Sequence, residues 1–396
     1  MSEQDYLVKL LDGVDVEWKL LGDASFFEIA NNGRKPVKSS LRVAGKTPYY
    51  GANNIQDYVD GYTHDGEYVL IAEDGSASLE RYSIQYTTGK FWANNHVHVV
   101  RGKSGVNSRF LYHYLHIVNF IPFLTGGVRS KLTKGQLIEI PVPIPCPDNP
   151  EKSLAIQSEI VRILDKFTSL TAELTAELTM RKKQYSYYRD QLLSFEEGEM
   201  ELKALDDVCA LISAGGDVPE NSVKGQLKPT IEYPYPIYAN ATDEKGLYGY
   251  TDSYKIDSDA VTISARGAKV GYHTVRDEKF TPIIRLIVLV ADKNLVRTRY
   301  LNYVLDMTAI GGTDGGIPQL TVPMVKKITI PIPFASNPNR SLAEQDRIIA
   351  ILDKFEILTN SISEGLPREI NLRQKQYEYY RDLLLSFPKP NVQEVA

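Results

Sequence analysis

Two stretches decide the fold: Gln184-Tyr-Ser-Tyr-Tyr-Arg-Asp-Gln-Leu-Leu-Ser-Phe195 and Gln376-Tyr-Glu-Tyr-Tyr-Arg-Asp-Leu-Leu-Leu-Ser-Phe387. Working outward, the match extends back to Ser153-Leu-Ala and Ser341-Leu-Ala. The period is far longer than that of a solenoid repeat, so it indicates a tandem duplication of a domain followed by a helix. We therefore expect two equivalent partner surfaces in one chain, with specificity carried by the parts that differ.

The repeat divides the chain into a module, a helix, a second module and a second helix. Each module has a normal size for one domain. The expected boundaries are 1–150 for the first module, 151–197 for the first helix, 198–338 for the second module, 339–387 for the second helix and 388–396 for a flexible tail.

Composition sets broad limits on the protein class. Hydrophobic residues make up 43% and charged residues 24%, as in soluble globular proteins. The chain has no apolar run long enough to span a membrane and no basic start followed by an apolar core, so a cytoplasmic location is expected. For Cys146 and Cys209, two reduced thiols are favoured over a disulfide or a metal site.

The charge balance does not favour nucleic acid as a partner. Residues 1–140 carry 15 basic and 15 acidic side chains, and residues 205–330 carry 14 and 15. A strongly basic domain would indicate DNA binding, but neither module is basic overall. DNA binding would therefore require basic residues gathered on one face.

Apolar residues three and four positions apart predict one long helix over 153–195. Ser153 and Ser341 are expected to be N-caps, and Ser341 with Glu344 forms a capping-box pattern. The tandem Thr-Ala-Glu-Leu units within 171–178 each lengthen the helix by about 6 Å. In the second copy, Gly365-Leu-Pro367 predicts a break or kink.

Two arrangements can bury the apolar stripe of these helices. Each helix could pack on its own module, or the two could pack on each other, antiparallel, as a spacer between the modules. We favour the second arrangement. The expected spacer and partner-binding residues are Leu164, Phe167, Leu170, Leu174, Leu178, Tyr185, Tyr188, Leu352, Phe355, Tyr377 and Tyr380.

Both modules are predicted to be α+β domains with the same order of strands followed by a helix. The predicted strands are 68–72, 83–87 and 96–100 in the first module, and 260–264 and 283–290 in the second. The predicted helices are 110–118 and 299–305.

Loops rich in Gly, Asn, Ser, Arg and Tyr fall at matching places in the modules. The pairs are 49–54 with 238–240, 73–76 with 265–268, and 126–131 with 311–316. For one loop, ordinary turn chemistry explains these residues. Three matched loops with different side chains favour contacts to a ligand.

Catalytic motifs fail on inspection. Gly45-Lys-Thr47 resembles the end of a phosphate-binding loop, but the required upstream glycine is absent. His96 and His98 alternate along a strand and cannot share a metal. His113 and His116 share a helical face without an apparent carboxylate or cysteine partner, so a surface or core pair is favoured. The chain is therefore interpreted as a recognition subunit without a catalytic or metal site.

The repeated helices resemble the spacers of specificity subunits of type I restriction-modification systems, in particular the type IC branch. The resemblance rests on residues 164–195, on the second copy ending at Phe387-Pro388, and on the opening Tyr6–Trp18. It is specific in the helices and weak within the modules.

That resemblance implies a fold and a set of partners. It implies two α+β target-recognition domains separated by two long, antiparallel, coiled-coil-like helices with pseudo-twofold symmetry. Each domain would read one half of a bipartite site on double-stranded DNA. The helices would set the half-site spacing and dock two modification subunits that methylate adenine. This chain would bind no cofactor, whereas S-adenosylmethionine, ATP and Mg are expected on the modification and restriction subunits.

Base reading is expected from polar side chains in the matched loops, because Arg and Lys favour guanine whereas Asn and Gln favour adenine. The candidates in the first module are Lys46, Tyr49, Asn53, Asn54, Ser76, Arg81, Asn94, His96, Arg129 and Lys131. Those in the second are Tyr238, Asn240, Arg266, Lys269, Thr313 and Gln319. The alternative is a cytoplasmic coiled-coil scaffold that binds proteins but no DNA.

Overall fold

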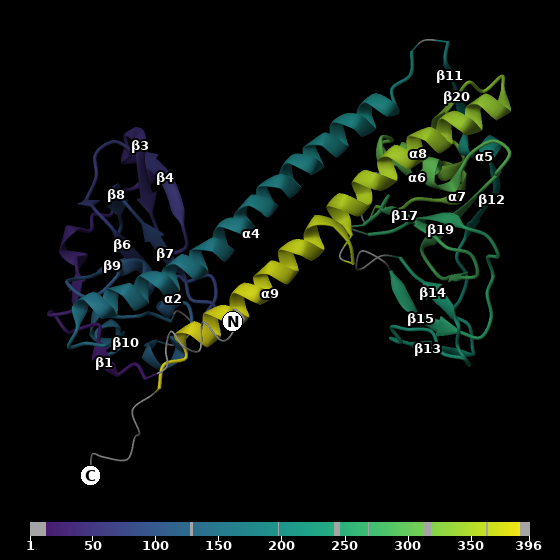
Figure 1. The fold of residues 1–396 in the computed structure, drawn as a ribbon. Helices are drawn as coiled ribbons and strands as arrows, with labels where there is room; N and C mark the ends of the chain where they lie inside the picture. Colours follow the sequence, from purple (N-terminus) through teal and green to yellow (C-terminus); the bar gives the residue numbers. More distant parts are fainter. Residues whose placement is uncertain are drawn as a thin grey trace. The chain divides into compact units, whose positions relative to one another are not determined.

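The computed structural model describes residues 13–126, 130–196, 198–240, 246–267, 269–311, 318–361 and 363–388. The chain forms two compact units (Figure 1). Unit 1 comprises Met1–Thr175 and Glu369–Ala396, and unit 2 comprises Ala176–Arg368. Each unit therefore contains one module, the beginning of the helix that follows it, and the last part of the helix that follows the other module.

Unit 1 contains two four-stranded sheets, ordered β2-β9-β6-β7 and β4-β3-β8-β5. The first sheet consists of β2 Phe27–Ile29, β6 Tyr68–Ala72, β7 Ile84–Thr87 and β9 Val97–Gly102. The second consists of β3 Ala44–Tyr50, β4 Ile55–Val59, β5 His64–Asp65 and β8 Lys90–Ala93. A separate antiparallel pair joins β1 Val16–Leu20 to β10 Pro141–Pro145. The helices are η1 Asn31–Gly33, η2 Ser39–Leu41, α2 Ser108–Leu115, η3 Ile121–Phe123, α3 Lys134–Leu137 and the first part of α4 Pro150–Leu192, together with the end of α9 Gly365–Leu385.

Unit 2 repeats this plan. Its sheets are ordered β12-β19-β16-β17 and β13-β15-β14-β18, and β11 Met200–Ala204 pairs with β20 Thr329–Pro333. The strands of the first sheet are β12 Cys209–Ala214, β16 Ala260–Ser264, β17 His273–Arg276 and β19 Leu286–Ala291. Those of the second are β13 Ser222–Lys224, β14 Tyr235–Tyr238, β15 Leu247–Thr251 and β18 Thr281–Pro282. The helices are α5 Leu205–Val208, α6 Thr298–Asp306, α7 Val322–Lys326 and α8 Pro338–Asn360, together with the end of α4 and the first turn of α9. The predicted α+β class and the shared order of strands and helix are confirmed.

The first sheet of unit 1 is covered on both faces, which explains the unbroken apolar run of β6. Alternate residues of a strand point to opposite faces. Val69 and Ile71 join the core that contains α2, whereas Leu70 joins a second cluster with Phe91 of the second sheet. All five residues of β6 are consequently buried.

The long helices begin earlier than predicted, and asparagines cap them. Asn149 accepts a hydrogen bond from the Lys152 amide, and Asn337 accepts one from the Arg340 amide. The prediction of Ser153 and Ser341 as caps is therefore wrong. Proline suits the first helical position because its fixed φ is helical and that position needs no N–H donor. The helices therefore begin at Pro150 and Pro338, three residues before the predicted serine caps.

The predicted capping box is also wrong. Glu344 binds Arg347 at 2.7 Å instead of reaching back to the cap. Ser341 is buried, and its hydroxyl accepts a hydrogen bond from Gln345 Nε2 at 3.2 Å.

A buried glutamine joins each long helix to the module before it. Gln157 Oε1 accepts from the Asn107 amide at 2.8 Å, and its Nε2 donates to the Gly105 carbonyl at 2.9 Å. In unit 2, Gln345 accepts from the Arg297 amide at 2.8 Å and donates to the Leu295 carbonyl at 3.0 Å. Each glutamine thus satisfies the backbone where the module's own helix, α2 or α6, begins.

The last turn of each long helix lies in the core of the unit that holds the other module. Leu384, Leu385 and Phe387 belong to the core of unit 1, and the Trp18 indole donates to the Pro388 carbonyl at 2.8 Å. In unit 2, Leu193 occupies the corresponding core.

Within unit 1, α9 runs antiparallel to α4. Tyr380 stacks on Phe167 at 5.2 Å between ring centroids, whereas Phe387 contacts Phe110 at the level of Gln157. Increasing residue number in α9 therefore corresponds to decreasing residue number in α4. In unit 2, Tyr188 stacks on Phe355 at 5.5 Å, which repeats the contact of Tyr380 with Phe167.

The second helix is broken as predicted, slightly before Pro367. Helix α8 ends at Asn360, and α9 begins at Gly365, whose φ is +75°. A Cβ at this position would lie 2.4 Å from the Ile357 carbonyl oxygen. Pro367 is tolerated because it falls in the first turn of α9, where its missing N–H is not needed.

Gly365→Ala should lower the free energy of unfolding by about 1–3 kcal/mol, because the residue combines a left-handed backbone with a close carbonyl. Gly225→Ala is the matched control, since its φ is +78° and nothing lies within 4 Å of the added Cβ. Urea denaturation of both variants measures the difference. Equal losses would show that the carbonyl contact contributes nothing.

Candidate nucleic-acid interface

The first two matched loops of unit 1 are clamped together by Asn53. Its Nδ2 donates to the Gly75 carbonyl at 2.9 Å, and its Oδ1 accepts from the Ala77 amide at 2.8 Å. The Ser83 hydroxyl also donates to this Oδ1, at 2.6 Å. Asn53 is exposed, yet most of its hydrogen-bonding capacity holds the loops in shape.

The third loop joins them through Glu73. The Leu132 amide donates to the Glu73 carbonyl at 2.7 Å, and Lys131 Nζ lies 2.8 Å from the carboxylate. Arg34 binds the other oxygen of the same carboxylate. Burial alone would raise the pKa of Glu73, but the hydrogen bonds from Arg34 and Lys131 outweigh it and hold that pKa below its ordinary value.

His96 and Asn94 complete this group of loops. The Glu73 amide donates to the His96 carbonyl, and the His96 ring contacts Asp74. The Asn94 side chain accepts from the His96 amide at 2.8 Å. We call this convergence of residues 52–54, 73–83, 94–96 and 130–132 the loop corner of module 1.

The loop corner brings together most, but not all, of the residues predicted to read bases in module 1. Its exposed members among them are Asn53, Asn54, Arg81, His96 and Lys131. Ser76 is half-buried and bonds to Ser78 and Ser83.

Other predictions in module 1 need correction. Tyr49 is only 1% exposed and bonds through its hydroxyl to the Val37 backbone, so it cannot reach a base. Asn94 is buried and serves the loop itself. Lys46 lies near the beginning of β3, whereas the loop corner begins beyond the end of that strand. Arg129 lies outside the described residues.

Unit 2 has a corresponding loop corner, held by Asn240. Its Nδ2 donates to the Arg266 carbonyl at 2.9 Å, as Asn53 does to Gly75. Arg266 also forms a β-bridge with Gln319, which brings the third loop alongside. Asn240, Arg266 and Gln319 are therefore together, and Lys269 is exposed on the same loop as Arg266.

Tyr238 occupies a different environment from these residues. The Arg276 guanidinium lies 3.8 Å from the centre of its ring, and Phe280 contacts it edge-on. Burial raises the pKa of the Tyr238 phenol. These contacts commit most of the ring to packing within the protein. Thr313 lies outside the described residues.

The residues predicted on the helices fall into two groups. Leu164 and Leu352 are fully buried, so the prediction that they bind a partner is wrong. They join each helix to its module instead. The other apolar positions of the predicted stripe are only partly covered or exposed: Phe167, Leu170, Leu174, Leu178, Tyr185, Tyr188, Phe355, Tyr377 and Tyr380. Of these, the aromatic members of the stacks described above also pack within their own unit.

A duplicated helix surface lies outside the spacer and partner-binding residues predicted from the sequence. In α9 it consists of Leu372 and Tyr379, with Arg373 bonded to Glu369 and Gln376 beside them. These residues line a hollow of about 370 Å³. In α4 the same surface carries Met180 and Tyr187, with Arg181 bonded to Glu177 and Gln184. We call these the paired helix surfaces.

The signal for these surfaces was present in the sequence. Tyr187 is 61% exposed and Tyr379 is 52% exposed, although each ring contacts the ring of the next tyrosine along its helix. Their repetition at equivalent positions, outside the buried stripe, is the clue that periodicity alone overlooks.

The described residues contain no group of three His, Cys, Asp or Glu side chains placed to hold a metal ion. His113 is buried against Asp165; burial lowers its pKa more strongly than Asp165 raises it. Among the described helices, none is both long and apolar enough to cross a membrane.

Glu73→Gln should reduce the acid sensitivity of the protein. Because the pKa of Glu73 is lowered from about 4.5 on folding, its contribution to stability is present above that pH and is lost as the pH falls through the folded value. The difference in unfolding free energy between wild type and variant should therefore shrink below about pH 4.5. Glu80→Gln, an exposed change in the same loop corner, is the control. A difference that stays constant with pH would contradict the ion-pair account.

The chain matches one family model twice. The model of the type I restriction modification DNA specificity domain matches residues 15–180 and again residues 197–372.

Relatives match over nearly the whole chain. A putative type I restriction enzyme specificity subunit of Haemophilus influenzae is 47% identical, with 98% of this chain and 99% of the relative covered. The EcoR124I/EcoR124II specificity subunit of Escherichia coli is 36% identical, with the same coverage of both chains.

The fold is also shared with a solved structure. The type I restriction-modification S subunit from M. genitalium superposes with a TM-score of 0.64 at 14% identity, covering 96% of this chain and 98% of the other. This likeness concerns the fold alone. From the family model and the two relatives, this chain belongs to the type I restriction-modification specificity-subunit family.

Proposed function

We propose that this chain is the DNA specificity subunit of a cytoplasmic type I restriction-modification enzyme, in which each module reads one half of a bipartite duplex site. The observation that carries the proposal is the pair of loop corners. Asn53 and Asn240 hold them in the same way, yet the side chains that they present differ. One scaffold with two different reading surfaces suits a target whose two halves differ in sequence.

The loop corners have the chemistry of a reading surface. Arg266 and Lys131 suit guanine, whereas Asn54 and Gln319 suit adenine. The clamp fixes the loop backbones before DNA arrives, so less conformational entropy is lost on binding. His96 and Arg81 complete the exposed polar surface of module 1.

The paired helix surfaces are the proposed docking sites for two modification subunits. Two identical partners require two equivalent surfaces on one chain. Each surface combines an exposed tyrosine, an apolar residue and a rim of hydrogen-bonded Glu, Arg and Gln, which is the composition of an interface centre and its border. The partner subunits, and not this chain, would bind the cofactors. These are S-adenosylmethionine on the modification subunits, with ATP and Mg in the complex that also contains restriction subunits.

The proposal is tested by reconstituting the chain with its adenine methyltransferase partner and measuring duplex binding across a salt series. Sequence-specific, salt-dependent binding together with adenine methylation at a bipartite site is expected. A chain that assembles with proteins but shows no duplex binding at any salt concentration would instead be a scaffold.

Arg266→Ala should weaken binding to the target duplex by about 1–3 kcal/mol and relax specificity at one base position, if the arginine reads a base. Sequencing of methylated sites measures the specificity. Lys269→Ala, on the same loop, serves as the comparison. Equal loss on all sequences for Arg266→Ala would reassign it to a phosphate.

Tyr187→Ala and Tyr379→Ala should each weaken the docking of one modification subunit by about 2 kcal/mol, or roughly 30-fold. Native mass spectrometry should find complexes with one partner for each single variant and few complexes for the double variant. Tyr58→Ala removes an equally large exposed ring outside the helices and should leave assembly unchanged. Intact assembly of the double variant would exclude these surfaces.

A further inference from the structure

One segment of module 1 is rich in positive charge, although residues 1–140 as a whole have equal numbers of basic and acidic residues. Residues 34–46 contain Arg34, Lys35, Lys38, Arg42 and Lys46 and no acidic residue. These are five of the 15 basic residues within residues 1–140. We call residues 34–46 the basic segment.

The basic segment starts at the loop corner. The Arg34 guanidinium donates to the Val97 carbonyl at 2.9 Å and binds Glu73, the residue that joins the third loop. The Lys35 amide donates to the Ala93 carbonyl at 2.9 Å, one residue before Asn94. The Arg34 side chain thus holds the segment in place through these contacts, while the neighbouring Lys35 is exposed.

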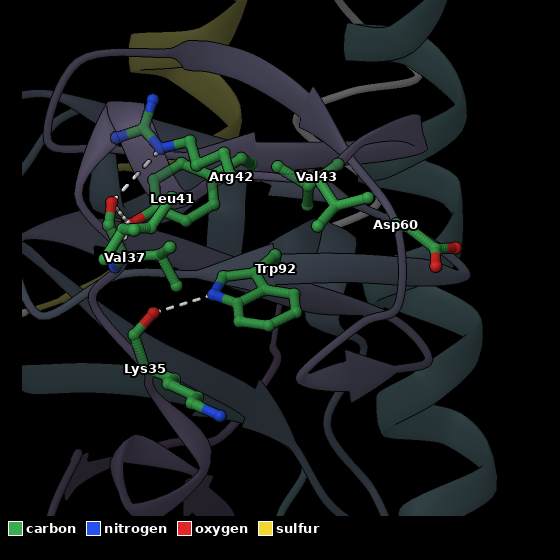
Figure 2. A pocket seen from close by; sticks show the side chains of 9 residues that line it. Lys35, Val37, Leu41, Arg42, Val43, Asp60 and Trp92 are labelled. Atoms are coloured by element: carbon green, nitrogen blue, oxygen red, sulfur yellow. Dashed lines mark hydrogen bonds between the residues drawn. The ribbon is translucent and has the colours of Figure 1, made fainter.

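The segment then runs along the second sheet of unit 1 and lines part of a hollow of about 290 Å³ (Figure 2). The Trp92 indole donates to the Lys35 carbonyl at 2.7 Å. The Arg42 guanidinium lies 4.1 Å from the centre of the Tyr49 ring and donates to the Val37 carbonyl. These contacts explain the burial of Tyr49, which supports the segment from below.

The charges of the segment are only partly neutralised. Asp57 lies 3.3 Å from Arg42, and Asp60 lines the other side of the hollow. Within the described residues, Lys35, Lys38 and Lys46 form no salt bridge, and all three are exposed. The segment therefore presents three ammonium groups along a path that starts at the loop corner and ends in the first half of β3.

We propose that Lys35, Lys38 and Lys46 contact phosphate groups of the duplex beside the half-site that module 1 reads. Lysine is a flexible point charge, which suits a phosphate better than a base edge. Leu41 and Val43, 70% and 68% exposed, lie between the charges where they can pack on sugar rings. Lys46 is thereby assigned to the backbone and not to a base.

This inference rests on the proposed function, because it adds a positioning surface to the same reading module. Phosphate contacts fix the register of a protein on DNA, and base contacts specify the sequence. The lysines are thus expected to supply affinity without changing which bases are read.

The test uses the assembled complex and the dependence of duplex affinity on salt. Lys35→Ala/Lys38→Ala/Lys46→Ala should reduce the slope of log affinity against log salt by about 2.7, since each phosphate contact contributes about 0.9. The methylated sequence should stay unchanged. The corresponding triple Lys→Arg variant should retain the wild-type slope.

Lys152→Ala/Lys166→Ala/Lys182→Ala is the charge-matched control, because it removes three exposed lysines from α4. A reduction of slope equal to that of the basic-segment variant would overturn the proposal, as would an unchanged slope in the basic-segment variant. Altered base preference would assign these lysines to base reading instead, and lost assembly would assign them to a protein contact. If the wild-type complex itself shows no salt-dependent duplex binding, the proposed function fails first.

Discussion

The architecture depends on burying the last turn of each long helix in the core of a module that this helix does not follow. Leu384 and Leu385 are buried beside residues of module 1, and Leu193 is buried beside residues of module 2. Burying such side chains contributes about 1.5–3 kcal/mol each, a large share of the stability of a single domain. Neither core is complete with only the contiguous residues of its own module.

This constraint explains why the helices, and not the modules, retain their sequence between the two copies. Each helix must make two sets of contacts. Its beginning binds the preceding module through Gln157 or Gln345, and its end packs in the core of the other module. The stacks of Phe167 on Tyr380 and of Phe355 on Tyr188 repeat the same geometry in both units. The loops face no such double requirement, because Asn53 and Asn240 bond to backbone and leave the neighbouring side chains free to differ.

The sequence predicted the large features because they rest on periodicity and repetition. Helix α4, the break before Pro367 and the shared order of strands and helix follow from patterns that span many residues. The errors concern single side chains with more than one possible partner. Ser153 resembles a cap but is buried under Gln157, because Asn149 and Pro150 begin the helix earlier. Tyr49 resembles a loop residue but supports Arg42, and no local pattern distinguishes these roles. Long-range partners such as Glu73 with Arg34 and Lys131 depend on the folded chain path.

The exchange of helix ends between units also limits how such genes can diversify. If a recombination event replaced the whole first half of the chain, the incoming segment would bring a new module 1 together with the helix end that fills the core of the old module 2. The new module would in turn have to accept the old Leu384 and Phe387. Successful exchanges should therefore join the chains near the ends of the modules, within the repeated helix sequence, where both parents place the same apolar side chains. The repeated helices thus offer the same apolar contacts to different modules. A module can therefore be replaced during evolution while each protein core stays filled.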